Sequence, residues 1–270
     1  MISSTQRIEL SKKVVPARAT INFPDEFRFG CEFEFYINGD NTEAIINELE
    51  DITGSDILVN LTELPLEADR NHCLCFKYDA SLGDQGVEIS TPICSYDTLV
   101  YYIARITMII EDFGSTNEDT GFHIHISIEK KDDIDFYAFI LLCNDANLLS
   151  NWGERNGYSL NPMEILNNLN EKDTRKLKNK KGRVWSIERR GIGHVEIRTI
   201  GGTSYHYEAT KICQELNHFI KIFKRCLCDM KMDSEYKTLL RNHLDVLENT
   251  SLEKKEKFHD FVRTIKPMHE

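Results

Sequence analysis

Four stretches of the chain alternate between apolar and polar residues, and this alternation restricts the fold more than any other feature of the sequence. In the clearest of them, FRFGCEFEFYI (27–37), aromatic and aliphatic side chains fall on one side of a strand, while Glu32 and Glu34 fall on the other. The other three lie within residues 80–91, 120–129 and 193–202. Strands of this kind are typical of an antiparallel sheet that is covered on one face only.

Apolar residues at helical spacing predict the elements that cover the apolar face of this sheet. Asp40 and Asn41 supply an N-cap residue for a first helix, which ends at about Asp51. Further helices are expected over 97–113, over 135–145, from about Ile212 to Leu227, and in the charged tail beyond 231. We therefore predict an α+β fold, with helices on one face of an antiparallel sheet.

The domain organisation follows from where these elements begin and end. Residues 1–24 show no clear periodicity and are expected to form an N-terminal extension, followed by a main domain over 25–230 and a helical C-terminal extension over 231–270. The section 53–72 is loop-rich, and the run 171–190, which carries nine Lys and Arg residues, is expected to be a mobile basic loop.

Composition excludes several classes of protein. The 270 residues are 41% hydrophobic, which is enough for a sizeable core, and the net charge of −11 argues against a nucleic-acid partner bound through a basic face. The chain has no apolar run long enough for a membrane span and no apolar leader, so we expect a soluble cytoplasmic protein without a membrane partner. Its eight cysteines are sparse and are expected to be reduced thiols.

The polar sides of the four alternating strands carry an unusual selection of residues. If the strands share one sheet, seven groups line one cleft: Glu32, Glu34, Glu88, His123, His125, Glu196 and Arg198. For any single strand, a solvated sheet face is the better explanation. Taken together, four glutamates with two histidines, one arginine and no lysine need a compensating cation, because like charges across strands repel. Carboxylate oxygens with some imidazole nitrogen suit Mg²⁺ or Mn²⁺.

The order of the motifs adds a family resemblance. FGCEFEF, DASLGDQGVEIS, TGFHIHIS and HVEIRTIGGT follow one another between about Phe29 and about Ile220, and together they resemble the amidoligase family, relatives of glutamine synthetase and glutamate–cysteine ligase. The resemblance implies that 25–230 is a glutamine synthetase-like catalytic domain, with a metal and ATP cleft on the open face of the sheet. It also implies ATP-dependent formation of an amide from a carboxylate and an amine, through an acyl phosphate.

The resemblance also assigns metal ligands to individual positions. Glu32 and Glu34 match the first two metal carboxylates, which serve different ions in these ligases. Glu88 matches a further ligand and is placed among the catalytic groups, His123 matches the metal-binding histidine, and Glu196 matches the last metal carboxylate. The cofactors implied are ATP and Mg²⁺ or Mn²⁺.

Substrate-binding roles follow in the same way. His125 is expected to approach the nucleotide phosphates, Arg198 to hold the reacting carboxylate or the transferred phosphoryl group, and Arg155 in NWGERNGYS to contact the nucleotide. Asp79 is expected to contact substrate or metal, although the second acidic ligand of glutamine synthetase is matched equally by Asp79, by Asp84 or by no residue.

The basic run 171–190 has two interpretations. It is either a solvated loop or a lid over ATP, in which Lys180, Lys181 or Arg183 closes on the triphosphate and Arg189 or Arg190 reaches the phosphates.

Three other functions are compatible with parts of the sequence. A phosphotransferase of the same fold would need no amine, and a non-catalytic nucleotide-binding protein would keep the fold without the reaction. His123, His125 and Glu129 also resemble the metal motif of cupin barrels, although the long helices fit a barrel poorly. The carboxylate and amine substrates, small molecules or peptides, are not specified by the sequence, and neither is the oligomeric state.

Overall fold

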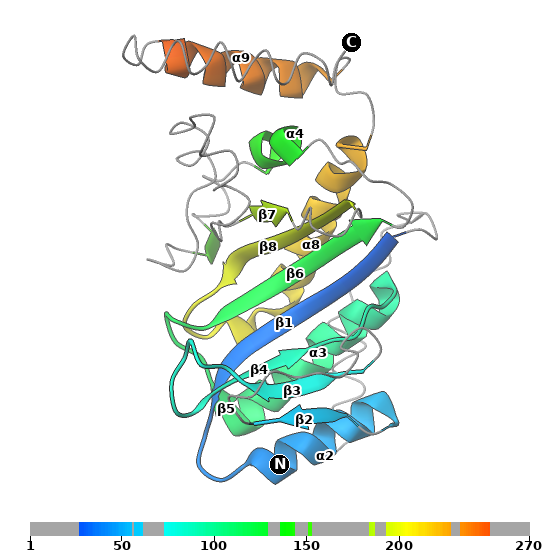
Figure 1. Ribbon diagram of the computed structural model, residues 1–270, viewed down its shortest axis with the longest axis vertical. Coiled ribbons are helices and arrows are strands. Elements are labelled where there is room, and N and C mark those ends of the chain that lie inside the picture. The colour runs from blue at the N-terminus through cyan, green and yellow to red at the C-terminus, as the bar shows by residue number, and fades with distance from the viewer. Residues whose placement is uncertain are drawn as a thin grey trace.

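The computed structural model describes residues 27–55, 57–61, 73–128, 136–143, 151–152, 184–186, 193–227 and 233–248. These residues form an open, mostly antiparallel sheet with helices against one face (Figure 1), which confirms the predicted α+β class. The predicted N-terminal extension and most of the C-terminal one lie outside the described residues, so the proposed domain boundaries stay predictions.

The sheet is built around its longest strand, β1 (Phe27–Ile37). Across the sheet the strands follow in the order β2 (Leu58–Asn60), β3 (Cys75–Tyr78), β4 (Gly86–Ser90), β1, β6 (Gly121–Ile128), β8 (Gly193–Gly201) and β7 (Val184–Ser186). A short strand, β5 (Gly114–Ser115), also pairs with β1. Since β4 and β6 are both antiparallel to β1, they run parallel to each other on its two sides.

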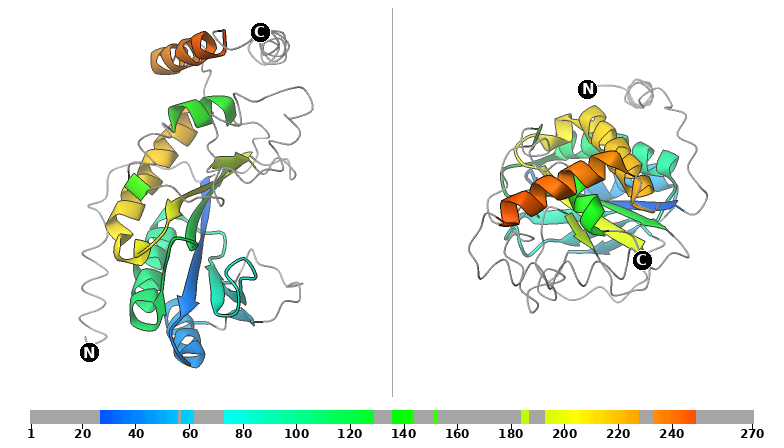
Figure 2. Two further views of the ribbon diagram at one scale, coloured as in Figure 1. Left: turned by 90° about the vertical axis from the view of Figure 1, so that its left-hand side faces the viewer. Right: turned by 90° about the horizontal axis from the view of Figure 1, so that it is seen from above.

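The described helices are α2 (Thr42–Thr53), α3 (Tyr96–Phe113), α4 (Phe136–Leu142), α8 (Ala209–Arg225) and α9 (Ser234–Glu248), with a short 3₁₀ helix, η2, at Tyr205–Tyr207. Of these, α3 and α8 lie against the apolar face of the sheet, whereas α9 lies beyond the sheet, next to α4 (Figure 1). Figure 2 shows the sheet edge-on, with α3 and α8 on the same side of it. Ring contacts join β1 to both helices. The ring centroid of Phe27 lies 5.5 Å from that of Phe223 in α8, and the ring centroid of Phe29 lies 6.1 Å from that of Tyr96 in α3. Among the helices of the described ranges, none is long and apolar enough to cross a membrane.

The loop-rich section 53–72 also contains β2, which pairs in parallel with β3. Two local predictions need correction. The basic run 171–190 contains β7, which pairs with β8. Strands of three residues are too short to show alternation, so only their pairing reveals them. Asn41 is the N-cap residue of α2, but its side chain does not cap the helix and donates instead to the carbonyl of Asn38.

The turn between β3 and β4 requires glycine at position 86. A Cβ added to Gly86 would lie 2.1 Å from Cβ of Leu82, a separation far inside van der Waals contact. A Cβ on Gly30 of β1 would meet its nearest atom, Oγ1 of Thr91, at an ordinary 3.7 Å. The structure therefore distinguishes two strand glycines that the sequence does not.

We expect Gly86→Ala to lower the free energy of unfolding by about 1–3 kcal/mol, because the turn must shift to admit the methyl group. Gly30→Ala is the matched control and should change it by less than about 1 kcal/mol. Urea unfolding of both variants tests this, and equal losses of stability would contradict the close contact at Gly86.

Candidate metal centre

The register of the central strands brings the predicted polar groups to one face of the sheet. Glu34 of β1 lies directly opposite Glu88 of β4, and Glu32 lies opposite His123 of β6. His125 lies opposite Glu196 of β8. Residues directly opposite each other point to the same side, so these carboxylates and imidazoles share the face that the described helices leave uncovered.

A β-bulge in β8 brings Arg198 to the same place. Ile197 pairs with Ile124 and Ile200 pairs with Phe122, so Arg198 and Thr199 together lie opposite the single residue His123. The alternation of β8 therefore breaks at the bulge, and the sequence shows this as a spacing of three between two buried isoleucines. NH1 of Arg198 donates to Oε1 of Glu196 and lies 3.3 Å from Nδ1 of His123.

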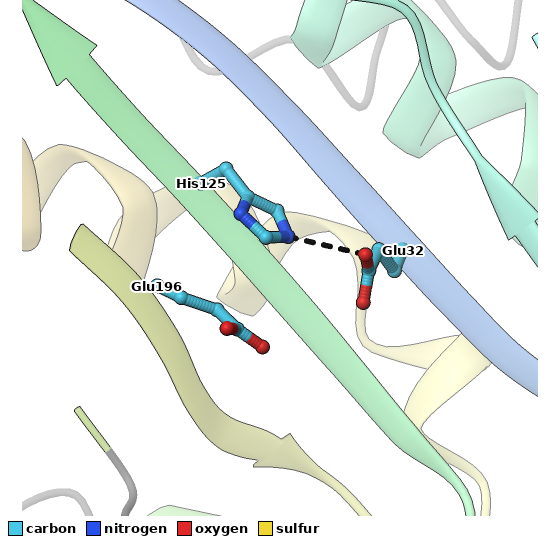
Figure 3. Close-up of side chains that lie close together, drawn as sticks. All are labelled: Glu32, His125 and Glu196. Atoms are coloured by element: carbon cyan, nitrogen blue, oxygen red, sulfur yellow. Dashed lines mark ion pairs between the residues drawn. The ribbon is translucent and has the colours of Figure 1, made fainter. Parts of the chain in front are cut away.

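Three side chains form a group with the geometry of a metal site. One ligand atom from each of Glu32, His125 and Glu196 lies within 4.8 Å of the others. Figure 3 shows the three pointing toward one another from β1, β6 and β8. The side chains of Glu32 and His125 are 27% and 21% exposed, so an ion can reach this group from solvent.

A second set of groups lies deeper beside the first. Nδ1 of His123 lies 2.8 Å from Oε2 of Glu32, and its Nε2 lies 3.3 Å from Oε1 of Glu34. The side chains of His123 and Glu34 are only 2% and 8% exposed. Oε2 of Glu34 accepts a hydrogen bond of 2.7 Å from the backbone N–H of Gly121, which fixes the position of this carboxylate.

The two imidazoles carry nitrogens suited to a metal. A carboxylate only accepts hydrogen bonds, so Nδ1 of His123 must carry the proton in its contact with Glu32. Nε2 is buried and makes no hydrogen bond to any described residue, and the same holds for Nε2 of His125. His123, which donates one N–H to a carboxylate and keeps its other nitrogen open, has the usual arrangement of a metal ligand. The residues present therefore fit a divalent ion.

The imidazoles of this group interact with the carboxylate of Glu32. Burial acts to raise the pKa of Glu32, but the neighbouring imidazoles of His123 and His125 outweigh burial and hold that pKa well below its usual range. Burial acts to lower the pKa of His125, and the neighbouring carboxylate of Glu32 reverses this, so that its pKa is raised. Both shifts favour a carboxylate beside an imidazolium, so a metal would have to displace a proton.

Glu88 has a different counter-charge. Its Oε1 lies 2.7 Å from Nζ of Lys77 and accepts a hydrogen bond from Oγ of Ser90. Burial, followed by the charge of Glu32, raises the pKa of Glu88, and Lys77 offsets part of this rise. The seven predicted groups include no lysine, but β3 pairs with β4 and places Lys77 directly opposite Glu88, on the same face. The alternation of Phe76 and Lys77 could have indicated this.

His194 is a further residue of this face that was not predicted. Its Nε2 lies 3.1 Å from Nδ1 of His125, from a position two residues before Glu196 on β8. The i, i+2 spacing places it on the same side as Glu196, so the sequence contained the signal. His194 orients the imidazole of His125 from the side opposite Glu32.

The remaining predicted site residues lie apart from this group or outside the described residues. Oδ1 of Asp79 accepts hydrogen bonds from the backbone N–H and the hydroxyl of Ser81, so it closes the turn after β3. The predicted nucleotide contacts lie outside the described residues: Arg155, Lys180, Lys181, Arg183, Arg189 and Arg190. Their assigned roles, and that of Asp79 in catalysis, stay predictions.

We compared the chain with protein-family models and with curated proteins, and neither comparison gives a match.

Proposed function

We propose that this protein is an ATP-dependent carbon–nitrogen ligase of the glutamine synthetase-like class, which joins a carboxylate to an amine through an acyl phosphate. The observation that supports this most is that carboxylates and imidazoles from β1, β4, β6 and β8 meet on the uncovered face of one sheet. The order of the four motifs along the chain, which resembles that of the amidoligase family, supports amide formation as the reaction. The open sheet, with helices on one face, suits this proposal and does not suit a cupin barrel.

Glu32, His125 and Glu196 would hold the divalent ion. Two carboxylates and one imidazole suit Mn²⁺, which accepts nitrogen beside oxygen, whereas Mg²⁺ prefers oxygen ligands. When bound, the ion supplies positive charge that neutralises the phosphate oxygens of ATP. His123 and His194 orient these ligands, because one donates to Glu32 and the other contacts His125.

Arg198 would hold the reacting anion. The bulge in β8 directs its guanidinium beside Glu196 and His123, where it is nine-tenths buried. Its Nε is buried and makes no hydrogen bond to the described residues, so this donor is available to a substrate. A planar guanidinium binds a carboxylate or a phosphoryl group through two parallel hydrogen bonds, which lysine cannot do.

The proposed reaction has two steps. A carboxylate oxygen attacks the γ-phosphorus of ATP, and the bond to the β-phosphate oxygen breaks to release ADP. The amine nitrogen then attacks the carbonyl carbon, phosphate leaves, and the nitrogen loses a proton. The protein must keep water from the acyl phosphate, because hydrolysis would consume ATP without forming an amide.

The direct test supplies ATP, Mg²⁺ or Mn²⁺ and pooled amino acids, then measures ADP, phosphate and condensed products by mass spectrometry. We expect ADP and an amide product in equal amounts, and no amide when the amines are left out. ADP with a phosphorylated product that needs no amine would instead identify a phosphotransferase. Nucleotide binding without any turnover would identify a binding protein, and an absence of ATP binding would contradict the proposal as a whole.

A further inference from the structure

The ion pair between Lys77 and Glu88 divides the acidic face into two unlike halves. Across the sheet, Lys77 of β3, Glu88 of β4 and Glu34 of β1 form one row of directly opposite residues. The group of Glu32, His125 and Glu196 lies on the other side of β1, toward β6 and β8. Within the described residues, Lys77 contacts Glu88 in the first half and Arg198 contacts Glu196 in the second, and a three-ligand group is found only in the second.

Glu34 and Glu88 are a pair of like charges that needs a cation. Carboxylates directly opposite each other on neighbouring strands repel, and both of these side chains are largely buried. A protein can meet this need with a divalent ion or with the ammonium group of a lysine. Here Nζ of Lys77 lies 2.7 Å from Oε1 of Glu88, and the two side chains are only 21% and 11% exposed.

A divalent ion bound by the same carboxylate would lie beside this ammonium group. The two cations would repel strongly in a site with so little solvent to screen them. Glu34 is also engaged elsewhere, because its Oε2 accepts from Gly121 and its Oε1 faces His123. The row of Lys77, Glu88 and Glu34 is therefore already neutralised in part before any metal arrives.

We propose that the ammonium of Lys77 takes the place of a second divalent ion, so that the chain itself holds one ion, bound by Glu32, His125 and Glu196. The inference rests on the metal centre of the proposed function. It assigns Lys77 as the residue that limits how many metal ions the face accepts, and it leaves Glu88 as a partner of lysine rather than a ligand.

The test counts Mn²⁺ bound per chain in metal-stripped protein, without nucleotide, by equilibrium dialysis with the free ion measured by electron paramagnetic resonance. We expect one ion in the wild type and two in Lys77→Met, which removes the charge but keeps most of the side-chain volume. Lys77→Arg keeps the charge and should bind one ion. Lys221→Met, an exposed lysine of α8 on the helical side of the sheet, makes the same change in net charge and should also bind one.

Glu88→Gln provides a test that does not depend on the folding of Lys77→Met. If Glu88 is not a ligand, this variant should bind one Mn²⁺ with an affinity within about threefold of the wild type, whereas a loss of tenfold or more would overturn the inference. Two ions in the wild type, or one in a folded Lys77→Met, would also overturn it while leaving the metal centre intact. No bound ion in the wild type would overturn the inference together with the metal centre.

Discussion

Replacing Glu32 by glutamine is expected to weaken Mn²⁺ binding by at least about 100-fold, because one substitution removes a ligand and the group that orients two histidines. Oε2 of Glu32 lies 2.8 Å from Nδ1 of His123, and Oε1 lies 3.4 Å from Nε2 of His125. Glutamine has nearly the same shape but no charge, so the change tests charge and metal affinity rather than packing. Titration of metal-stripped protein with Mn²⁺ measures the loss.

Glu43→Gln is the matched control for Glu32→Gln. Glu43 is an exposed residue in the first turn of α2, a helix outside the sheet that packs against α3. Its loss changes the net charge by the same amount and should leave Mn²⁺ affinity unchanged. Wild-type affinity in Glu32→Gln would show that the ion binds elsewhere on the protein.

Replacing Arg198 by methionine is expected to lower the free energy of unfolding of the metal-free protein by about 3–5 kcal/mol, because it leaves a buried carboxylate without its cation. Arg198 is 9% exposed, Glu196 is 3% exposed, and the guanidinium donates directly to the carboxylate. A divalent ion bound at Glu196 would replace part of the lost charge. Saturating Mn²⁺ should therefore stabilise Arg198→Met more than it stabilises the wild type.

Urea unfolding with and without Mn²⁺ measures both effects of Arg198→Met. Arg241→Met, an exposed arginine of α9, is the control and should change stability by less than about 0.5 kcal/mol in either condition. If Mn²⁺ stabilises Arg198→Met and the wild type equally, Glu196 does not take part in holding the ion.

The shared polar face could be predicted from the sequence because the period of a strand is two. In β1 and β6 the apolar residues of the alternation are buried, apart from the half-buried Ile37, so Glu32, Glu34, His123 and His125 could only emerge on the other side. The helix expected over 97–113 was confirmed as α3, and it could be predicted because its buried residues recur at helical spacing.

The pairing of individual side chains could not be predicted, because it depends on register between strands that are far apart in sequence. The two histidines of β6 have the same alternation, yet register places His123 opposite Glu32 and His125 opposite Gly30 and Glu196. The three-ligand group therefore contains His125, which was expected at the phosphates, whereas His123 lies deeper. The bulge at Arg198 and the partner of Glu88 depend on the same long-range pairing.

The central position of β1 has a consequence for synthesis of the protein on the ribosome. Its phenylalanines and its unpaired backbone groups leave the ribosome before the strands that flank it, β4 and β6, are made. An aromatic strand without partners readily pairs with strands of other chains. We therefore expect nascent chains to be most prone to aggregation before β6 emerges, and to depend on chaperones during that interval.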